Sequence, residues 1–449
     1  MKKTSLTEGT ILGPLLKFGA PVLLALFLQS LYGAVDLFVV GRFSESADVS
    51  GVSTGSQIMM TLTNLVSSFS MGVTIMLGHQ IGQGRTKDAG KTIGTGIVLF
   101  LIIGVFLSAL TAIFASPISH TMQAPAEAFS ETVSYVRICG LGFIVIIFYN
   151  LIGSIFRGIG DSNTPLVTVA VASLVNIGAD LLLVAGFKMG AAGAAIATVF
   201  AQIVSVVFSI IFISRRKVPF EFKMSDISFD GAIVKHITKL GLPIALQDLL
   251  VGISFLVIMA IVNSLGLIFS AGIGVAEKVC AFIMLVPLSF MQSMSAFVAQ
   301  NVGAQKYGRA TKALCYGIIV SLSFGVIMFF AGFFHGTIFT EIFSKDPKVV
   351  VAAAEYLKAY AIDAMLTSFL FCFIGFYNGF GLTRFVMIQG IVGAFCIRIP
   401  LSFLASRITP PSLFRIGLAT PCSTAVQILL CFGCMIYVKK KFLSKNTAV

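Results

Sequence analysis

The sequence predicts an all-α integral membrane protein, with twelve transmembrane helices in two parallel-repeat six-helix bundles. Three observations support this fold class. Hydrophobic residues make up 57% of the 449 residues and charged residues 11%, against about 25% charged residues in soluble domains, and the mean hydropathy is +0.99. Twelve apolar runs are each long enough to cross a bilayer. The second half of the chain also repeats the motifs of the first half.

The twelve expected spans are separated by charged residues or by Gly and Pro. They centre near residues 28, 65, 104, 144, 176, 202, 252, 284, 323, 366, 395 and 426. Six spans fall in each half, and the longest polar connection lies between the halves. We therefore expect four parts: an N-lobe (1–214), a cytoplasmic linker (215–238), a C-lobe (239–438) and a basic cytoplasmic tail (439–449).

The duplication is visible in motifs that return at offsets of 222, 221 and 221 residues. They are Lys17-x-Gly19-x-Pro21 with Lys239-x-Gly241-x-Pro243, Tyr135-x-Arg137 with Tyr356-x-Lys358, and Gly158-x-Gly160 with Gly379-x-Gly381. Two similar halves can enclose a cavity that opens alternately to either side of the membrane. The sequence therefore indicates a transporter.

The net charge of +13 comes from Lys and Arg residues that are divided unequally between the two sides of the membrane. If the N-terminus is cytoplasmic, 21 of the 31 Lys and Arg residues fall on the inner side and six on the outer side. This positive-inside asymmetry predicts two cytoplasmic termini in a multi-pass protein of the plasma membrane, the cytoplasmic or inner membrane of a bacterium. The basic residues are not interleaved with aromatic residues, so the bilayer is expected as a partner and nucleic acid is not.

Two acidic residues lie clearly at membrane depth, Asp36 in the first span and Asp180 in the fifth. A central Asp costs about 2.5–3.5 kcal/mol on insertion scales, so it normally faces a cavity or a partner. Gln29 and Tyr32 share a helical face with Asp36, and Asn176 shares a face with Asp180. These five residues are candidates for one polar site.

Asn150 in the fourth span and Thr198 in the sixth can add polar oxygens to this site. Such oxygen ligands suit a dehydrated alkali cation, Na⁺, or a trapped proton. No other metal and no cofactor is expected. The alternative is that the two acids only hold helices together by hydrogen bonds.

The second repeat lacks these acids. At an offset of 222, Asp36 corresponds to Ile258, Asn176 to Arg398 and Asp180 to Ser402. The polar site is therefore expected to be a specialisation of one lobe.

The second half carries its own polar residues at membrane depth. Gln247, Asp248, Glu277 and Asp363 are candidates for the lining of a substrate cavity. The alternative for Asp248, next to Gln247, and for Asp363 is a position near the interface, where they are solvated. The alternative for Glu277 is a structural role, in which it partly satisfies other helices. Pro21 lies about one turn into the first span, where the missing backbone hydrogen bond favours a bend.

Five motifs in this order resemble the multidrug and toxic compound extrusion (MATE) family, in its DinF-like branch. They are Gln29-x-x-Tyr32-x-x-x-Asp36, Gly82-x-Gly84, Asn150 followed by Arg157-Gly158-x-Gly160-Asp161, Asn176-x-x-x-Asp180, and Gly303-Ala304. The resemblance covers essentially the whole chain.

The resemblance implies the V-shaped MATE/MOP fold, with two lobes around a central cavity that exchange Na⁺ or H⁺ for organic cations. It also implies a cation site at Asp36, Asn176 and Asp180, supported by Asn150 and Thr198, and bending of the first span at Pro21. The NorM-like branch carries a Glu where this chain has Val251, which favours the DinF-like pattern.

We therefore expect a monomeric secondary antiporter that exports small organic cations or drugs by alternating access. The alternative is a lipid-linked oligosaccharide flippase of the same superfamily, which would need several cavity bases for pyrophosphate. An enzyme is not expected, because the sequence has no HExxH, GxSxG or P-loop pattern. The eight cysteines lie inside apolar runs, singly apart from Cys431-x-x-Cys434, and a structural packing role is expected for them.

Overall fold

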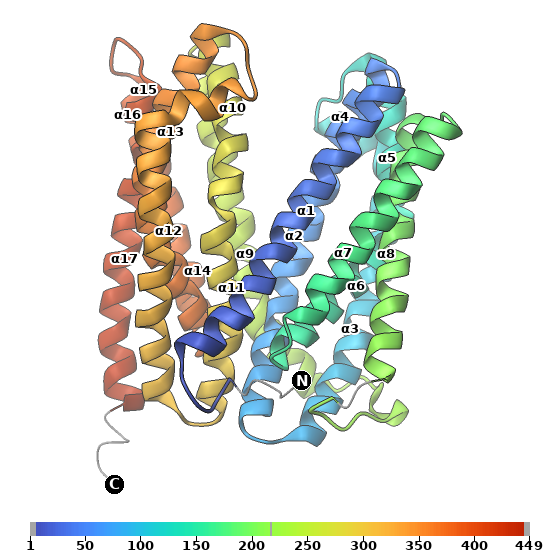
Figure 1. Cartoon of the computed structure of the whole chain (residues 1–449), viewed down its shortest axis with the longest axis vertical. Helices are drawn as coiled ribbons and strands as arrows, with labels where there is room; N and C mark the ends of the chain where they lie inside the picture. Colours follow the sequence, from blue (N-terminus) through green and yellow to red (C-terminus); the bar gives the residue numbers. More distant parts are fainter. Residues whose placement is uncertain (1–5, 216–217, 444–449) are drawn as a thin grey trace. The chain divides into compact units, whose positions relative to one another are not determined.

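The computed structural model of the chain describes residues 6–215 and 218–443, and helices dominate it (Figure 1). Some of the basic residues counted above lie outside the described residues: Lys2, Lys3, Arg216, Lys217 and Lys445, with the rest of the tail from residue 444. Contacts divide the chain into two compact units. The first-repeat unit is residues 20–245, and the second-repeat unit is residues 246–449 together with the stretch up to Gly19.

In the first half, the described residues form eight α-helices and three short 3₁₀ or π turns. They are α1 (Leu12–Phe43), α2 (Ser46–Gly82), α3 (Thr86–Ile113), α4 (Ala115–Thr121), η1 (Ala126–Ala128), α5 (Phe129–Leu141), α6 (Phe143–Gly158), α7 (Asn163–Asp180), the π-helix η2 (Leu181–Gly186), α8 (Gly190–Ser214) and η3 (Met224–Asp226).

In the second half, nine α-helices and two π-helical turns are found up to residue 443, where the described part of the chain ends. They are α9 (Gly231–Asn263), α10 (Leu267–Ile283), α11 (Leu285–Gly303), α12 (Tyr307–Glu341), α13 (Pro347–Gly379), α14 (Thr383–Ile391), η4 (Val392–Arg398), α15 (Ile399–Ser406), α16 (Leu413–Gly417), α17 (Ala419–Val438) and η5 (Lys439–Leu443).

These helices match the expected spans. Within the described residues, ten helices are long and apolar enough to cross a membrane. Two further spans are bent: α5 and α6 meet at 54°, and α10 and α11 meet at 41°. Counting each bent pair as one span gives the expected twelve, so the all-α multi-pass fold is confirmed.

The two repeats break different helices. In the first-repeat unit, α2 is continuous and packs against α5 and α6, which are separated at Gly142. In the second-repeat unit, α13 is continuous and packs against α10 and α11, which are separated at Met284. The span containing α13 is the most buried of the ten, at 72%, so it forms the centre of its unit.

The repeated Lys-x-Gly-x-Pro motif marks the place where the first helix of each repeat passes from one unit to the other. The chain changes unit after Gly19 in α1 and after Ala245 in α9. A Cβ atom at Gly19 would lie 3.5 Å from Ser293 Oγ on α11. A Cβ atom at Gly241 would overlap the Phe69 carbonyl on α2. Glycine therefore lets the first turns of each repeat approach the second span of the other repeat closely.

Helix α1 continues as one α-helix through Pro21, immediately after the change of unit. Bending at Pro21 stays a prediction. The expected division into lobes at residues 214 and 239 follows the sequence repeats and also stays a prediction. By contacts, the first turns of α1 and of α9 belong with the opposite repeat.

A short segment before α1 is fixed to the start of α12. Arg309 donates to the carbonyl oxygens of Leu6, Glu8, Gly9 and Thr10 at 2.6–3.3 Å. Charge-assisted hydrogen bonds of this kind are stronger than neutral ones. They fasten residues 6–10 to the second-repeat unit, in agreement with the assignment of this stretch by contacts.

The close approach at Gly241 is testable. We expect Gly241→Leu to destabilise the protein by about 1–3 kcal/mol or more, because the new side chain meets the α2 backbone. Gly252→Leu on the same helix is the matched control, since nothing lies within 4 Å of a Cβ atom there. Thermal unfolding can be followed with a thiol-reactive dye that reports exposure of buried cysteines such as Cys139. Equal melting temperatures for the two variants would contradict the proposed packing.

Candidate cation-binding site

The first wall of the site is one face of α1. Asp36 is 5% exposed, whereas Gln29, two turns earlier, is exposed and Tyr32 is partly exposed. The Gln29 amide nitrogen donates to the Tyr149 hydroxyl on α6 at 3.3 Å. This face therefore runs from an accessible amide to a buried carboxylate.

The opposite wall is the end of α7. Asn176 and Asp180 lie one turn apart and are both 0% exposed. Asp180 is the last residue of α7, and the π-helix η2 begins at Leu181. π-Helical turns are common at functional sites, because the extra residue re-aims side chains locally.

The two acids face each other. A proton shared between the carboxyl groups of Asp36 and Asp180 would join them by a hydrogen bond. When both are ionised, each is an acceptor only and neither can satisfy the other. Buried like charges repel each other strongly, because the low dielectric constant of the interior screens them weakly. A proton or a metal cation between them removes that repulsion.

The site contains more polar atoms than it pairs. Among the described residues, the buried atoms without a hydrogen-bond partner include Asp36 Oδ1, both Oδ atoms of Asp180, both amide atoms of Asn176 and Thr198 Oγ1. Native proteins leave few such groups unpaired, and each needs an explanation. Carboxylate, amide and hydroxyl oxygens are the donor set of a hard cation. The side chains present therefore fit Na⁺ as well as a proton.

Two residues that we did not predict line the same site on α5. The Tyr135 hydroxyl lies beside Thr198 of α8, and Cys139 lies one turn after Tyr135. Both are within electrostatic range of Asp36. Tyr135 belongs to a motif that recurs as Tyr356 in the second repeat, which was the available signal.

Asn150 is placed differently from the other candidates. Its amide nitrogen donates to Ile146 of its own helix, α6, at 2.9 Å. This leaves the amide oxygen as its free ligand atom for any other partner. Participation of Asn150 in the site stays a prediction.

The MatE family model matches this chain twice, at residues 21–182 and 243–404. The chain belongs to the MatE family. The two matches are offset by 222 residues, as are the repeats recognised in the sequence, so the MATE resemblance is confirmed. MatE proteins are transporters, so the prediction that this chain is not an enzyme is also confirmed.

Relatives of this MatE chain span nearly its whole length. The probable multidrug resistance protein YoeA of Bacillus subtilis is 24% identical over 431 residues, which cover 94% of this chain and 93% of YoeA. The multidrug export protein MepA of Staphylococcus haemolyticus is 23% identical over 397 residues, which cover 88% and 87%.

Solved MATE structures have the same fold. The crystal structure of MATE in the bent conformation aligns over 100% of both chains, with a TM-score of 0.91 and 19% identity. A MOP superfamily transporter from Pyrococcus furiosus aligns over 98% of this chain and 99% of the other, with a TM-score of 0.91 and 19% identity.

The four polar candidates of the second repeat have different environments in this MatE chain. Gln247 is 7% exposed and packs against Gly390, whereas Asp248 is exposed. Glu277 is half-buried and Asp363 is 2% exposed. These residues stay candidates for a substrate cavity.

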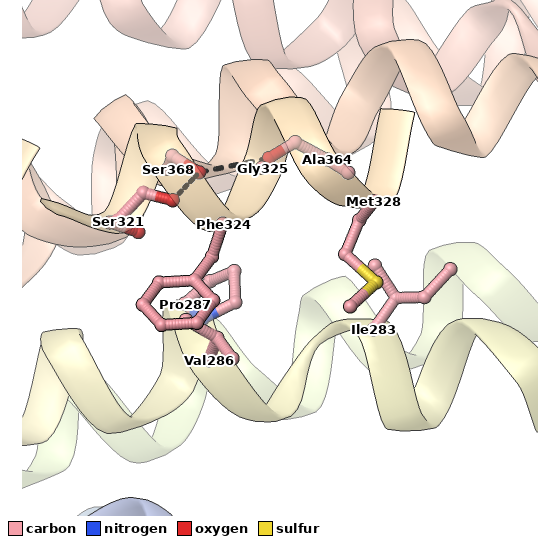
Figure 2. A pocket seen from close by; sticks show the side chains of 9 residues that line it. All are labelled: Ile283, Val286, Pro287, Ser321, Phe324, Gly325, Met328, Ala364 and Ser368. Atoms are coloured by element: carbon pink, nitrogen blue, oxygen red, sulfur yellow. Dashed lines mark hydrogen bonds between the residues drawn. The ribbon is translucent and has the colours of Figure 1, made fainter. Parts of the chain in front are cut away.

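A small hollow in the second-repeat unit contains none of these four residues (Figure 2). It lies among α11, α12 and α13, with Pro287, Phe324 and Met328 in its wall. Its cavity volume is about 10 Å³, which is room for about one water molecule. This hollow is too small for an organic cation.

The paired acids give a stability prediction. In Na⁺-free buffer at neutral pH, we expect Asp180→Asn to stabilise the protein by about 1–3 kcal/mol, because it removes a buried like charge and supplies a donor to Asp36. Na⁺ should raise the melting temperature of the unaltered protein and leave that of Asp180→Asn unchanged.

The control for this experiment is Glu45→Gln, which neutralises an exposed acid of the same unit whose side chain makes no cap hydrogen bond. It should change neither melting temperature nor Na⁺ response. If Asp180→Asn destabilised the protein and kept the Na⁺ response, the acid pair would be a structural hydrogen-bonding device instead.

Proposed function

We propose that the chain is a secondary active antiporter for multidrug efflux, which exports organic, often cationic and lipophilic compounds in exchange for Na⁺ or H⁺ by alternating access. The observation that carries the proposal is the buried pair Asp36 and Asp180, in which Asp36 Oδ1 and both Oδ atoms of Asp180 lack donors within the described residues. The names of YoeA and MepA, a multidrug resistance protein and a multidrug export protein, support the substrate class.

The coupling follows from charge. With Asp36 and Asp180 ionised, the first-repeat unit attracts a cation, and neutralisation by Na⁺ or H⁺ removes that attraction. Ion and organic cation therefore favour different states of the transporter, which is the condition for exchange. Asn176, Thr198 and Tyr135 offer further oxygens to the ion.

The direction of transport depends on the gradient. A one-for-one exchange of monovalent cations moves no net charge, so it draws only on the chemical gradient of the coupling ion. If a net charge does cross, it contributes about 2.3 kcal/mol per 100 mV. Efflux measured under separate Na⁺, pH and voltage gradients distinguishes these modes.

We further propose a monomer in the cytoplasmic membrane of a bacterium, with both termini cytoplasmic. The distribution of Lys and Arg along the sequence supports this orientation. The flippase alternative needs several cavity bases. The site at Asp36 and Asp180 contains two acids, and this favours the exchange of cations.

The central test is efflux of ethidium from proteoliposomes under separate Na⁺ and pH gradients. We expect Asp36→Asn and Asp180→Asn each to lower gradient-driven efflux by at least about tenfold, since a typical coupling free energy corresponds to 5–150-fold. Glu45→Gln is the control and should transport normally. Wild-type rates in both acid variants under either gradient would remove the acid pair from the mechanism.

A second test measures competition at equilibrium. We expect the coupling ion to weaken binding of a fluorescent organic cation by about 5–150-fold, and the organic cation to weaken ion binding by the same factor. Titration in detergent against Na⁺ and, separately, against pH identifies the ion. Equal affinity at all Na⁺ and H⁺ concentrations would argue against exchange.

A further inference from the structure

Among the described residues, the second-repeat unit contains one deeply buried base, Arg398. It ends the π-helix η4 and is 5% exposed. Its Nη1 donates to Ser254 Oγ at 3.2 Å, and its guanidinium lies 4.4 Å from the centre of the Phe255 ring. It also acts electrostatically on Tyr356 and Asp363. A guanidinium stays charged at any physiological pH, so the interior of this unit carries a permanent cation.

Arg398 occupies the position of Asn176 in the other repeat. The two matches to the family model begin at 21 and 243 and end at 182 and 404, which are 222 residues apart at both ends. The neighbours of Arg398 also correspond to residues around the acid pair. The equivalent pairs are Tyr32 with Ser254, Asp36 with Ile258, Tyr135 with Tyr356, Cys139 with Tyr360, and Asn176 with Arg398. The surroundings of Arg398 and of the acid pair are therefore equivalent. We call these two sets of equivalent residues the first chamber, around Asp36 and Asp180, and the second chamber, around Arg398.

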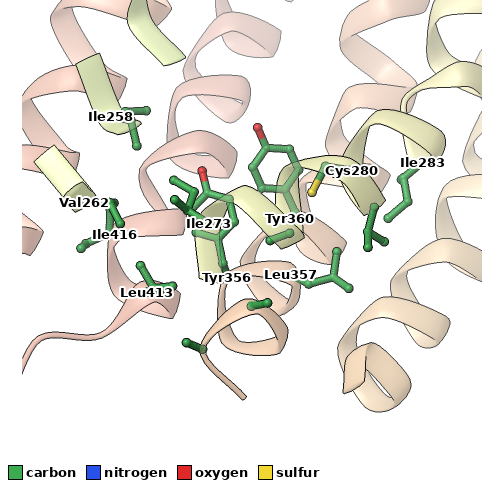
Figure 3. Packing of buried hydrophobic residues seen from close by; sticks show 14 of the residues in the cluster. Ile258, Val262, Ile273, Cys280, Ile283, Tyr356, Leu357, Tyr360, Leu413 and Ile416 are labelled. Atoms are coloured by element: carbon green, nitrogen blue, oxygen red, sulfur yellow. The ribbon is translucent and has the colours of Figure 1, made fainter. Parts of the chain in front are cut away.

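In the second repeat, the acidic residues lie at positions that are not equivalent to Asp36 and Asp180. Ile258, at the position of Asp36, packs in an apolar cluster with Tyr356 and Tyr360 (Figure 3). The buried acid is Asp363 on α13, at the position of Gly142, where the first repeat breaks α5 from α6. A further acid, Glu277 on α10, is half-buried and acts on Tyr356.

The chain itself supplies charges of both signs here. Arg398 provides one positive charge, and Asp363 and the half-buried Glu277 provide negative charge. Arg398 acts electrostatically on Asp363. Among the described residues, Arg398 Nε and Asp363 Oδ1 have no hydrogen-bond partner. No base among the described residues acts in the same way on Asp36 or Asp180.

We propose that Arg398 is a tethered cation, which holds in the second repeat the place that an exchangeable ion takes in the first. The second chamber then takes up no coupling ion, and only one of the two repeated chambers takes part in exchange. This proposal rests on the proposed function for its consequence on transport. The role of Arg398 as a fixed counter-charge to Asp363 can be tested without transport.

The test replaces the tethered cation by the residue of the other repeat. Arg398→Asn is made in a background in which the first chamber is silenced by Asp36→Asn and Asp180→Asn. Purified protein is assayed for radiolabelled Na⁺ binding and for proton uptake by potentiometric titration. We expect the background to show neither, and Arg398→Asn to gain about one bound Na⁺ or proton per chain, because Asp363 becomes an uncompensated buried acid.

Two matched variants identify the cause. Arg398→Lys keeps a positive charge and should show no gain. Adding Asp363→Asn to Arg398→Asn should abolish the gain. Na⁺ or acid should also raise the melting temperature of the Arg398→Asn variant by several degrees and leave the background unchanged.

The outcomes separate this proposal from the proposed function. A folded Arg398→Asn protein with no gain, or a gain that persists with Asp363→Asn, overturns the tethered cation. If Arg398→Asn fails to fold but folds again with Asp363→Asn, the counter-charge role stands; if neither folds, Arg398 is a packing residue and the proposal fails. Failure of the unaltered protein to exchange ions would disprove the proposed function and leave this result unaffected.

Discussion

Two buried carboxylates, with no base acting on them among the described residues, are the constraint on which this molecule depends. Asp36 and Asp180 come from helices of the same unit, α1 and α7. Burying one ionised acid is costly, and burying two together is more costly still. Neutralisation of the pair by a cation or a proton is therefore expected to stabilise the folded unit, and under the proposed function the energy of that event selects one conformation over another.

The asymmetry between the repeats follows from the same constraint. One repeat leaves its acids uncompensated, and the other places Arg398 within reach of Asp363. Both chambers keep the same helices and the same tyrosine, Tyr135 or Tyr356. The two repeats share the same scaffold. Under the proposed function, a few residue differences determine which repeat binds a cation or a proton from solution.

The fold was predictable because its signals are local and strong. Each expected span became one helix or one bent pair, since apolar runs of membrane length have few alternatives. The acids were also predictable, because a charged side chain at membrane depth is conspicuous. The breaks at Gly142 and Met284 were not, because a glycine or a methionine in an apolar run is equally compatible with a continuous helix.

The rest of the site could not be obtained from spacing alone. Tyr135 and Cys139 look like packing residues in the sequence, and only the contact of α5 with α8 brings them to Thr198. Asn150 shows the opposite case, a polar residue in the right span whose amide bonds to its own helix. Periodicity gives the face of a helix, and it does not say which neighbour that face meets.

The exchanged first turns of α1 and α9 bear on how such a chain could have arisen. Each repeat provides the surface that the other repeat's opening helix needs, at Ser293 for Gly19 and at Phe69 for Gly241. A single unduplicated copy would have no partner for its opening helix or for the surface of its second span. Two identical copies could cover these surfaces by exchanging their N-terminal turns, as domain-swapped dimers do. Gene fusion would then have joined two associated polypeptides covalently into one chain.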